Sequence, residues 1–203
     1  MARTVAGRRL TQQHRIAQVR LAVLVTREAR ELWPLLDPAR LEETTPGWIN
    51  ALLRVIVQHR RASAELSRRY LQGFRLLETG AAQRIDTALS PLDVSAAATS
   101  LAVTGPVRIR RALRRSQPIE RARNLALTES ARAAARHALN GGRELITQAV
   151  AADPRARGWA RVTAGNACAF CTLLASRGAV FTEASGDFAA HDGCNCSAEP
   201  AYD

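Results

Sequence analysis

The stretch CAFCTLLASRGAVFTEASGDFAAHDGCNC, residues 168–196, contains all four cysteines of the chain and one of its four histidines. Cys168 and Cys171 form a C-x2-C pair. Nineteen residues later, His191, Cys194 and Cys196 form an H-x2-C-x-C group. Two short-spaced groups of soft ligands separated by a loop are typical of one tetrahedral Zn²⁺ site. Metal binding would also supply folding energy, because so small a segment buries little apolar surface of its own.

Five candidate ligands compete for four positions in this site. The spacing favours Cys168, Cys171, His191 and Cys194, and Cys196 could replace either of the last two. Two disulfides and free thiols are the alternatives. Residues 1–10, MARTVAGRRL, have no apolar stretch typical of a secretory signal, so we expect synthesis in a reducing compartment. Grouped cysteines in that environment more often hold a metal ion.

The motif favours a structural zinc over a catalytic one. Catalytic zinc sites keep an open position and place a carboxylate base beside it. Asp192 and Gly193 follow His191, so neither H-x-E nor H-E-x-x-H is present. We therefore expect no enzymatic activity and no small-molecule substrate.

Composition predicts a mainly α-helical chain. Ala and Leu supply most of the apolar residues and aromatics make up only 4%. We expect a long-helix region over residues 1–154, followed by a small zinc-stapled α+β module over residues 155–203. No apolar run reaches the roughly 18 residues that a membrane span requires, so we expect no membrane partner.

Periodicity, proline and glycine predict the individual elements. The expected helices span residues 8–33 (ended by Pro34), 46–78 (with Thr45 as N-cap and Gly80 at the end), 81–105 (with breaks at Ser90-Pro91 and Gly105-Pro106), 118 to 137–139 (closed by Asn140-Gly141-Gly142) and 143–152 (ended by Asp153-Pro154). The expected strands are residues 159–163, 179–181 and 196–202, with one helical turn over residues 172–177.

Charge is distributed unevenly. Residues 1–161 carry 28 arginines against 13 acidic residues, whereas residues 162–203 carry one arginine against five acids. A basic region of this kind favours an anionic partner, and nucleic acid is the obvious one. Its densest cluster consists of Arg108, Arg110, Arg111, Arg114 and Arg115. This cluster could be a solvated face, a phosphate-binding surface or a protein contact. All basic residues are arginine, which also reflects a GC-rich coding sequence.

The C-terminal part resembles a known family. The matching segments are Gly158-Trp-Ala-Arg-Val162, Cys168-Ala-Phe-Cys171, Leu174-Ala-Ser-Arg-Gly178 and His191-Asp-Gly-Cys-Asn-Cys196. They resemble the phage Mu protein F-like minor head proteins, particularly those encoded beside the portal protein in phages of actinobacteria. In that family the H-x2-C-x-C ending is the signature, and many members carry an upstream C-x2-C pair.

The resemblance implies a structural minor capsid or head morphogenesis protein. Such a protein would reside in the virion, inside the capsid or at the portal vertex, and in the host cytoplasm during assembly. Its expected partners are the portal protein, the major capsid protein, or both, and packaged double-stranded DNA. The alternative is a zinc-containing DNA-binding protein without sequence specificity. Against this alternative, the cysteine-rich part is acidic, whereas a zinc element that contacts DNA normally carries basic groups.

Overall fold

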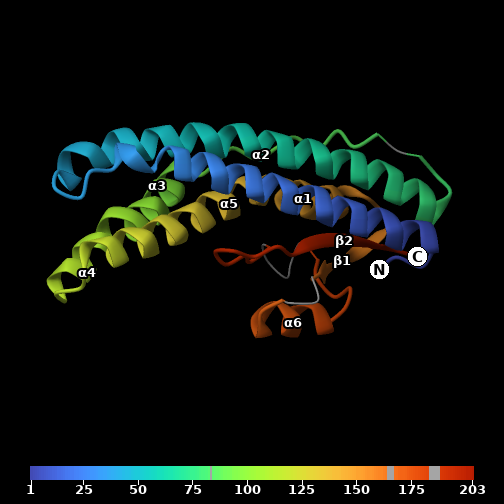
Figure 1. The fold of residues 1–203 in the computed structure, drawn as a ribbon. Coiled ribbons are helices and arrows are strands. Elements are labelled where there is room, and N and C mark those ends of the chain that lie inside the picture. The colour runs from blue at the N-terminus through green and yellow to red at the C-terminus, as the bar shows by residue number, and fades with distance from the viewer. Residues whose placement is uncertain (83, 164–166, 183–187) are drawn as a thin grey trace.

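The computed structural model of the chain describes residues 1–82, 84–163, 167–182 and 188–203 and is mainly helical (Figure 1). The elements in chain order are α1 (Val5–Glu31), a 3₁₀ turn (Trp33–Leu35), α2 (Leu41–Thr79), α3 (Val94–Ala102), a π-helical turn (Val103–Val107), α4 (Arg108–Arg114), α5 (Ile119–Ala152), β1 (Ala156–Val162), α6 (Ala169–Ser176) and β2 (Ser197–Tyr202). Helices α1, α2 and α5 pack against one another, and a small sheet lies beside them. The predicted fold class is confirmed.

Helix α2 begins earlier than the sequence predicted. The expected start at Pro46, with Thr45 as N-cap, was wrong, because the helix begins at Leu41 and contains Pro46. Leu41 is buried and anchors the first turn in the core. Pro46 removes only the hydrogen bond to the carbonyl of Glu42, a solvent-exposed residue. The predicted end was right: Gly80 follows the helix with φ +68° and donates its N–H to Leu76.

The region between α2 and α4 differs from the expected broken helix over residues 81–105. Its described residues before Val94 form no helix, and α3 begins there because Asp93 accepts the N–H of Ala96 at 2.8 Å. Residue 83 lies outside the described residues. Gly105-Pro106 does not end the helical conformation, because the wide π-helical turn accommodates the proline. A Cβ on Gly105 would lie 2.5 Å from Trp48, so close packing requires glycine there.

Helix α5 is one helix rather than the expected two. Gly141 and Gly142 lie buried inside it and face α2. A Cβ on Gly141 would lie 2.4 Å from the carbonyl oxygen of Arg60, and one on Gly142 would lie 2.4 Å from Ser67 Oγ. The two glycines therefore allow α2 and α5 to approach closely. This packing outweighs the cost of about 1 kcal/mol that each glycine imposes on a helix.

Strands β1 and β2 form a two-stranded antiparallel sheet, which confirms the strands predicted over residues 159–163 and 196–202. Trp159 pairs with Pro200 in this sheet and also forms an isolated bridge with Phe181, where residues 179–181 were expected to be a strand. Strand β2 is buried along its whole length. Its Glu199 accepts hydrogen bonds from Ala2 N–H at 2.8 Å and from Thr11 Oγ1 at 2.6 Å. The last strand is thus held by the start of the chain (Figure 1).

Two hydrophobic clusters fill the interior. The helical cluster includes Val25, Trp33, Trp48, Leu52, Ile56, Leu101, Ile109 and Ala134. The cysteine cluster includes Tyr70, Leu71, Phe74, Leu145, Ile146, Trp159, Cys171, Phe188, Cys194, Cys196 and Tyr202. Helices α2 and α5 contribute to both clusters. The division into residues 1–154 and 155–203 stays a prediction, while the structure shows three of the four cysteines packed in one core with α2 and α5.

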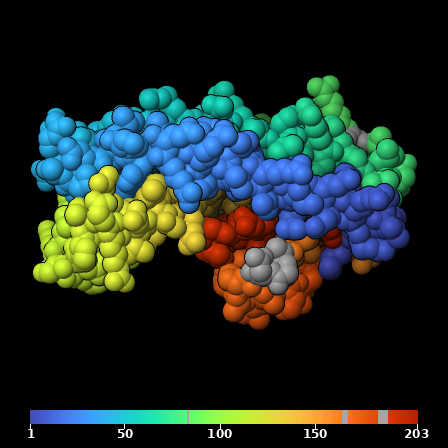
Figure 2. Space-filling model, viewed as in Figure 1, coloured from blue at the N-terminus to red at the C-terminus, as the bar shows by residue number. Residues whose placement is uncertain are grey.

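Two parts of the molecule project from its surface, and a notch lies between them. Figure 2 shows the part around α6 projecting beneath the helices, with a notch between it and the end formed by α4 and the start of α5. Among the described residues, no helix combines the length and apolarity needed to cross a membrane.

Candidate metal centre

The start of α6 presents the C-x2-C pair. Cys168 is the N-cap of the helix, and its Sγ accepts the backbone N–H of Cys171 at 3.4 Å. A residue at the N-cap and one at the third helical position point to the same side of the helix. The partial positive charge of a helix N-terminus also favours thiolates there. The spacing of the motif is therefore produced by helix geometry.

The second group of ligands lies on a tight turn. Cys194 donates its backbone N–H to the carbonyl of His191 at 3.0 Å, which closes the turn. Gly193 has φ +80°, a conformation that L side chains rarely adopt. The glycine thus permits His191 and Cys194 to face the same side.

The two groups converge on one cavity of about 200 Å³, which all five candidate ligands line. His191 Nε2 lies 3.0 Å from Cys168 Sγ and 3.4 Å from Cys171 Sγ. The Sγ atoms of Cys171 and Cys194 are 3.7 Å apart. Tetrahedral coordination with ordinary bond lengths places two sulfurs about 3.8 Å apart and a sulfur and a nitrogen about 3.6 Å apart. The Cys171–Cys194 and Cys171–His191 distances are close to these values, and the Cys168–His191 distance is shorter.

The five residues form two overlapping sets. Cys168, Cys171 and His191 form one set, and Cys171, Cys194 and Cys196 form the other, each with ligand atoms within 4.8 Å of one another. Cys171 belongs to both sets. All four cysteines are free thiols, so the alternative of two disulfides is not what the structure shows. These Cys and His groups could hold a metal ion, and the choice of four ligands among the five stays open.

The electrostatics of the thiols differ from one residue to the next. The backbone N–H of Cys171 lowers the pKa of Cys168, and burial raises the pKa of Cys171. A hydrogen bond from Cys196 lowers the pKa of Cys194, with help from the nearby guanidinium of Arg143. The same bond and burial raise the pKa of Cys196 well above its ordinary value. Of Cys194 and Cys196, Cys194 is thus the more readily ionised thiol.

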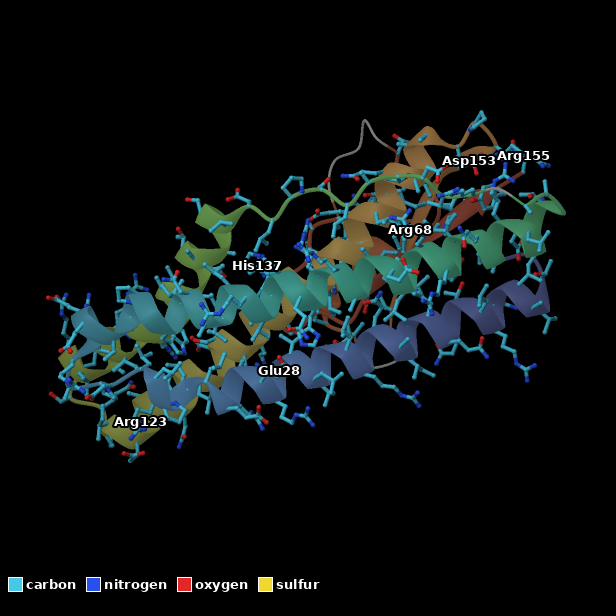
Figure 3. The ribbon with its side chains drawn as sticks, turned by 90° about the horizontal axis from the view of Figure 1, so that it is seen from above. Glu28, Arg68, Arg123, His137, Asp153 and Arg155 are labelled. Carbon is cyan, nitrogen blue, oxygen red and sulfur yellow. The ribbon has the colours of Figure 1, made fainter. Side chains whose placement is uncertain are left out.

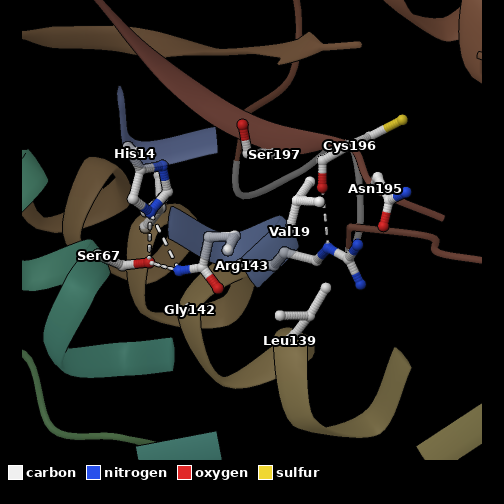
Figure 4. Close-up of a pocket in the computed structure, with 11 residues that line it drawn as sticks. His14, Val19, Ser67, Leu139, Gly142, Arg143, Asn195, Cys196 and Ser197 are labelled. Atoms are coloured by element: carbon white, nitrogen blue, oxygen red, sulfur yellow. Dashed lines mark hydrogen bonds between the residues drawn. The ribbon is translucent and has the colours of Figure 1, made fainter. Parts of the chain in front are cut away.

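Two buried arginines lie beside the cysteines, and sequence reasoning did not identify them. Arg143 of α5 donates from Nε to the carbonyl of Cys196 at 3.1 Å, as Figure 4 shows, and from Nη2 to the carbonyl of Cys194 at 2.6 Å. Arg161 of β1 donates to the carbonyl of Ala189 at 2.7 Å. Its guanidinium stacks on the ring of Phe188 at 3.9 Å. The loop of residues 188–196, here called the ligand loop, is therefore held by side chains from outside the cysteine motif.

A third arginine binds the same loop. Arg136 of α5 donates from Nε to Asp192 Oδ1 at 2.5 Å and from Nη2 to Ser100 Oγ at 2.9 Å. Arg132, one helical turn earlier, approaches Gly193. Arginines 132, 136 and 143 share one face of α5. Their helical spacing was the available sequence signal, although nothing in the sequence indicated which segment that face would contact.

The predicted arginine cluster is only partly paired. Arg108 lies 3.3 Å from Glu129, and Arg110 lies 3.6 Å from Glu42. Arg111, Arg114 and Arg115 are exposed and have no ion pair with any described residue. The arginine cluster and the sheet lie at opposite ends of the molecule. Arg123, labelled in Figure 3, marks the end that carries the cluster. The structure thus separates the arginine cluster from the candidate metal ligands.

In the described part of the chain, the other three histidines belong to no group of potential metal ligands. His59 bonds Glu28 of α1 at 2.9 Å, and His137 receives a bond from Arg136 at 3.1 Å (Figure 3). His14 lies 3.0 Å from Ser67 Oγ beside a cavity of about 10 Å³, and burial lowers its pKa to about 4 (Figure 4). The bonds of His14 and His59 join α1 to α2, whereas His137 bonds its neighbour within α5.

The fold and the site define a mainly helical protein whose C-terminal cysteines and histidine could hold a metal ion. The chain belongs to the VG15 protein family, whose model matches residues 5–203. Membership in this family indicates a protein of phage origin. Searches of curated proteins and of solved structures found no match.

Proposed function

We propose that this chain is a structural minor head protein of a tailed phage, stapled by zinc and without catalytic activity. One observation carries the proposal. The C-x2-C and H-x2-C-x-C motifs, which are part of the resemblance to the Mu F-like minor head proteins, converge on a single cavity in a chain whose family indicates phage origin. The fold places these residues against α5, where they would stabilise the module.

The donor set supports zinc. Thiolate and imidazole ligands with near-tetrahedral spacing suit Zn²⁺ better than they suit Mg²⁺ or Ca²⁺, which prefer oxygen. A structural role is supported by the surroundings of Asp192, the carboxylate within the ligand loop. Its Oδ1 accepts a hydrogen bond from Arg136, so this group is engaged in holding the loop and is poorly placed to act as a general base.

The portal protein, the capsid wall and packaged double-stranded DNA are the proposed partners. Arg111, Arg114 and Arg115 support an anionic contact, because they are exposed and unpaired within the described residues. Their contact with DNA would be to phosphates, so it would be independent of sequence and sensitive to salt. This surface is remote from α6, which leaves the projecting module free to contact a protein.

Mass spectrometry of purified proheads and mature particles tests the role in the virion. We expect the chain in at least one of these particles, at low copy number. Its absence from both would contradict the virion role and would favour the alternative of a DNA-binding protein that acts in the host cytoplasm.

DNA binding is tested with the arginines replaced by glutamine. We expect the R111Q/R114Q/R115Q variant to bind duplex DNA more weakly, with a salt dependence flatter by about two to three phosphate contacts. The matched control is R27Q/R40Q/R69Q, which removes the same charge from exposed arginines that already pair with acids. Equal losses in both variants would show that net charge alone, and not this surface, attracts DNA.

A further inference from the structure

Two buried guanidinium groups lie over the ring of Phe188, and both contact residues of the cysteine site. Arg143 lies 5.3 Å and Arg161 lies 3.9 Å from the ring centroid. We propose that Arg143 and Arg161 are positioning residues for the metal: they hold the ligand loop and provide the counter-charge for the metal-bound thiolates. This inference rests on the metal site of the proposed function.

Arg143 of α5 forms hydrogen bonds with the ligand loop. Its side chain donates to the carbonyls of Cys194 and Cys196 and, through Nη1, to Asn140 Oδ1 at 2.9 Å. The residue is only 3% exposed. Because the guanidinium donates hydrogen bonds to the backbone carbonyls of two candidate ligands, it fixes the direction of both thiols. Partners of this kind around metal ligands commonly orient them and tune the affinity of the site.

Both arginines need an anionic partner. A buried charge is costly unless it is paired, and a hydrogen bond to a carbonyl supplies no opposite charge. In the described part of the chain, neither Arg143 nor Arg161 lies within ion-pair distance of a carboxylate. Arg161 Nη1 instead lies 3.9 Å from Cys171 Sγ. The thiols are therefore the groups that can provide the missing negative charge.

The charge of the occupied site matches this need. Zn²⁺ with three thiolates and one imidazole has a net charge of about −1, and with four thiolates about −2. Either set would be stabilised by two nearby cations in a medium of low dielectric constant. Conversely, loss of the metal and protonation of the thiols would leave two buried cations without partners. The two arginines therefore link metal binding to the packing of the loop on α5 and β1.

Zinc affinity of the full chain tests the proposal. It is measured by chelator competition for the wild type and for R143M, R143K and R161M, together with the absorption spectrum after Co²⁺ substitution. We expect R143M and R161M to bind zinc about ten- to a hundredfold more weakly and to show altered thiolate-to-cobalt bands. R143K should recover part of the affinity, because it restores the charge but not the bidentate grip.

The matched control is R132M. Arg132 is on the same helix and approaches the same loop at Gly193, but it is exposed. We expect its zinc affinity and its cobalt spectrum to equal those of the wild type.

The outcomes separate the two proposals. A wild-type chain that binds no zinc would overturn the metal site, and this inference with it. A wild type that binds zinc, with R143K, R161M and R132M all binding equally well, would overturn this inference alone. If R143M does not fold, R143K and R161M decide the result, since R143K keeps the buried cation and R161M leaves the Arg143 grip intact.

Discussion

The two hydrophobic clusters share helices α2 and α5 but are held together in different ways. The helical cluster consists of side chains from helices and the 3₁₀ turn, with Trp48, Leu52 and Ile56 fully buried. The cysteine cluster also includes both strands, Phe188 and three of the four cysteines. Apolar packing alone fills the first, whereas in the second it surrounds a group of ionisable ligands.

This difference indicates which part of the molecule would depend on the proposed metal for its stability. The helical cluster contains none of the candidate metal ligands. In the cysteine cluster, Cys171 and Cys194 are at once core residues and candidate ligands. An unoccupied site would therefore weaken one end of the same long helices and leave the other end packed.

Metal removal should produce the largest effect. Chelation, or the substitution Cys171→Ser, should speed amide hydrogen exchange in β1 and β2 by about a hundredfold or more, because metal binding supplies folding energy there. The start of α2, around Trp48 and Leu52, should change far less. Hydrogen exchange followed by mass spectrometry resolves both regions. Uniform deprotection along the chain would show that the two clusters unfold as one unit.

A substitution that creates a cavity in the helical cluster tests the opposite case, in which the part remote from the candidate metal site is weakened. Leu52 is fully buried, so Leu52→Ala should lower the free energy of unfolding by about 3 kcal/mol. Urea denaturation measures the loss, and chelator competition measures zinc affinity in the folded variant. We expect an unchanged zinc affinity. A marked drop would mean that the helical cluster also shapes the metal site.

A smaller effect is expected where α2 and α5 approach most closely. Gly142→Ala places a Cβ near Ser63 and Ser67 and should destabilise the chain by about 1–2 kcal/mol through overpacking. Gly47→Ala is the control, because nothing lies within 4 Å of its Cβ and alanine favours the helix. Thermal unfolding of both variants gives the comparison. Equal stability of the two would show that the glycine contact is not required.

Local signals predicted much of this fold. The end of α2 at Gly80, the end of α5 before Pro154 and the pairing of the last strand follow from turn residues and alternation. The spacing also accounts for the approach of the side chains within each pair. C-x2-C at a helix start places Cys168 and Cys171 on one side, and H-x2-C on a turn does the same for His191 and Cys194.

The remaining features depend on distant parts of the chain. Gly141-Gly142 has the composition of a helix end, and only the proximity of Arg60 and Ser67 makes it a helix interior. Arg143 is one arginine among 29, and its role becomes visible only when the carbonyls of Cys194 and Cys196 lie against it. Tertiary contacts decided both cases against local propensity.

The bonds from Glu199 to Ala2 and Thr11 have a consequence for folding kinetics. These contacts join residues 197 and 188 positions apart, so their formation must close a very long loop. On the ribosome, α1 emerges long before β2 and before the cysteines. The helices can therefore assemble early, while insertion of β2 and binding of the proposed metal must wait for late synthesis. A nascent chain would expose the cysteine half of its core until that step.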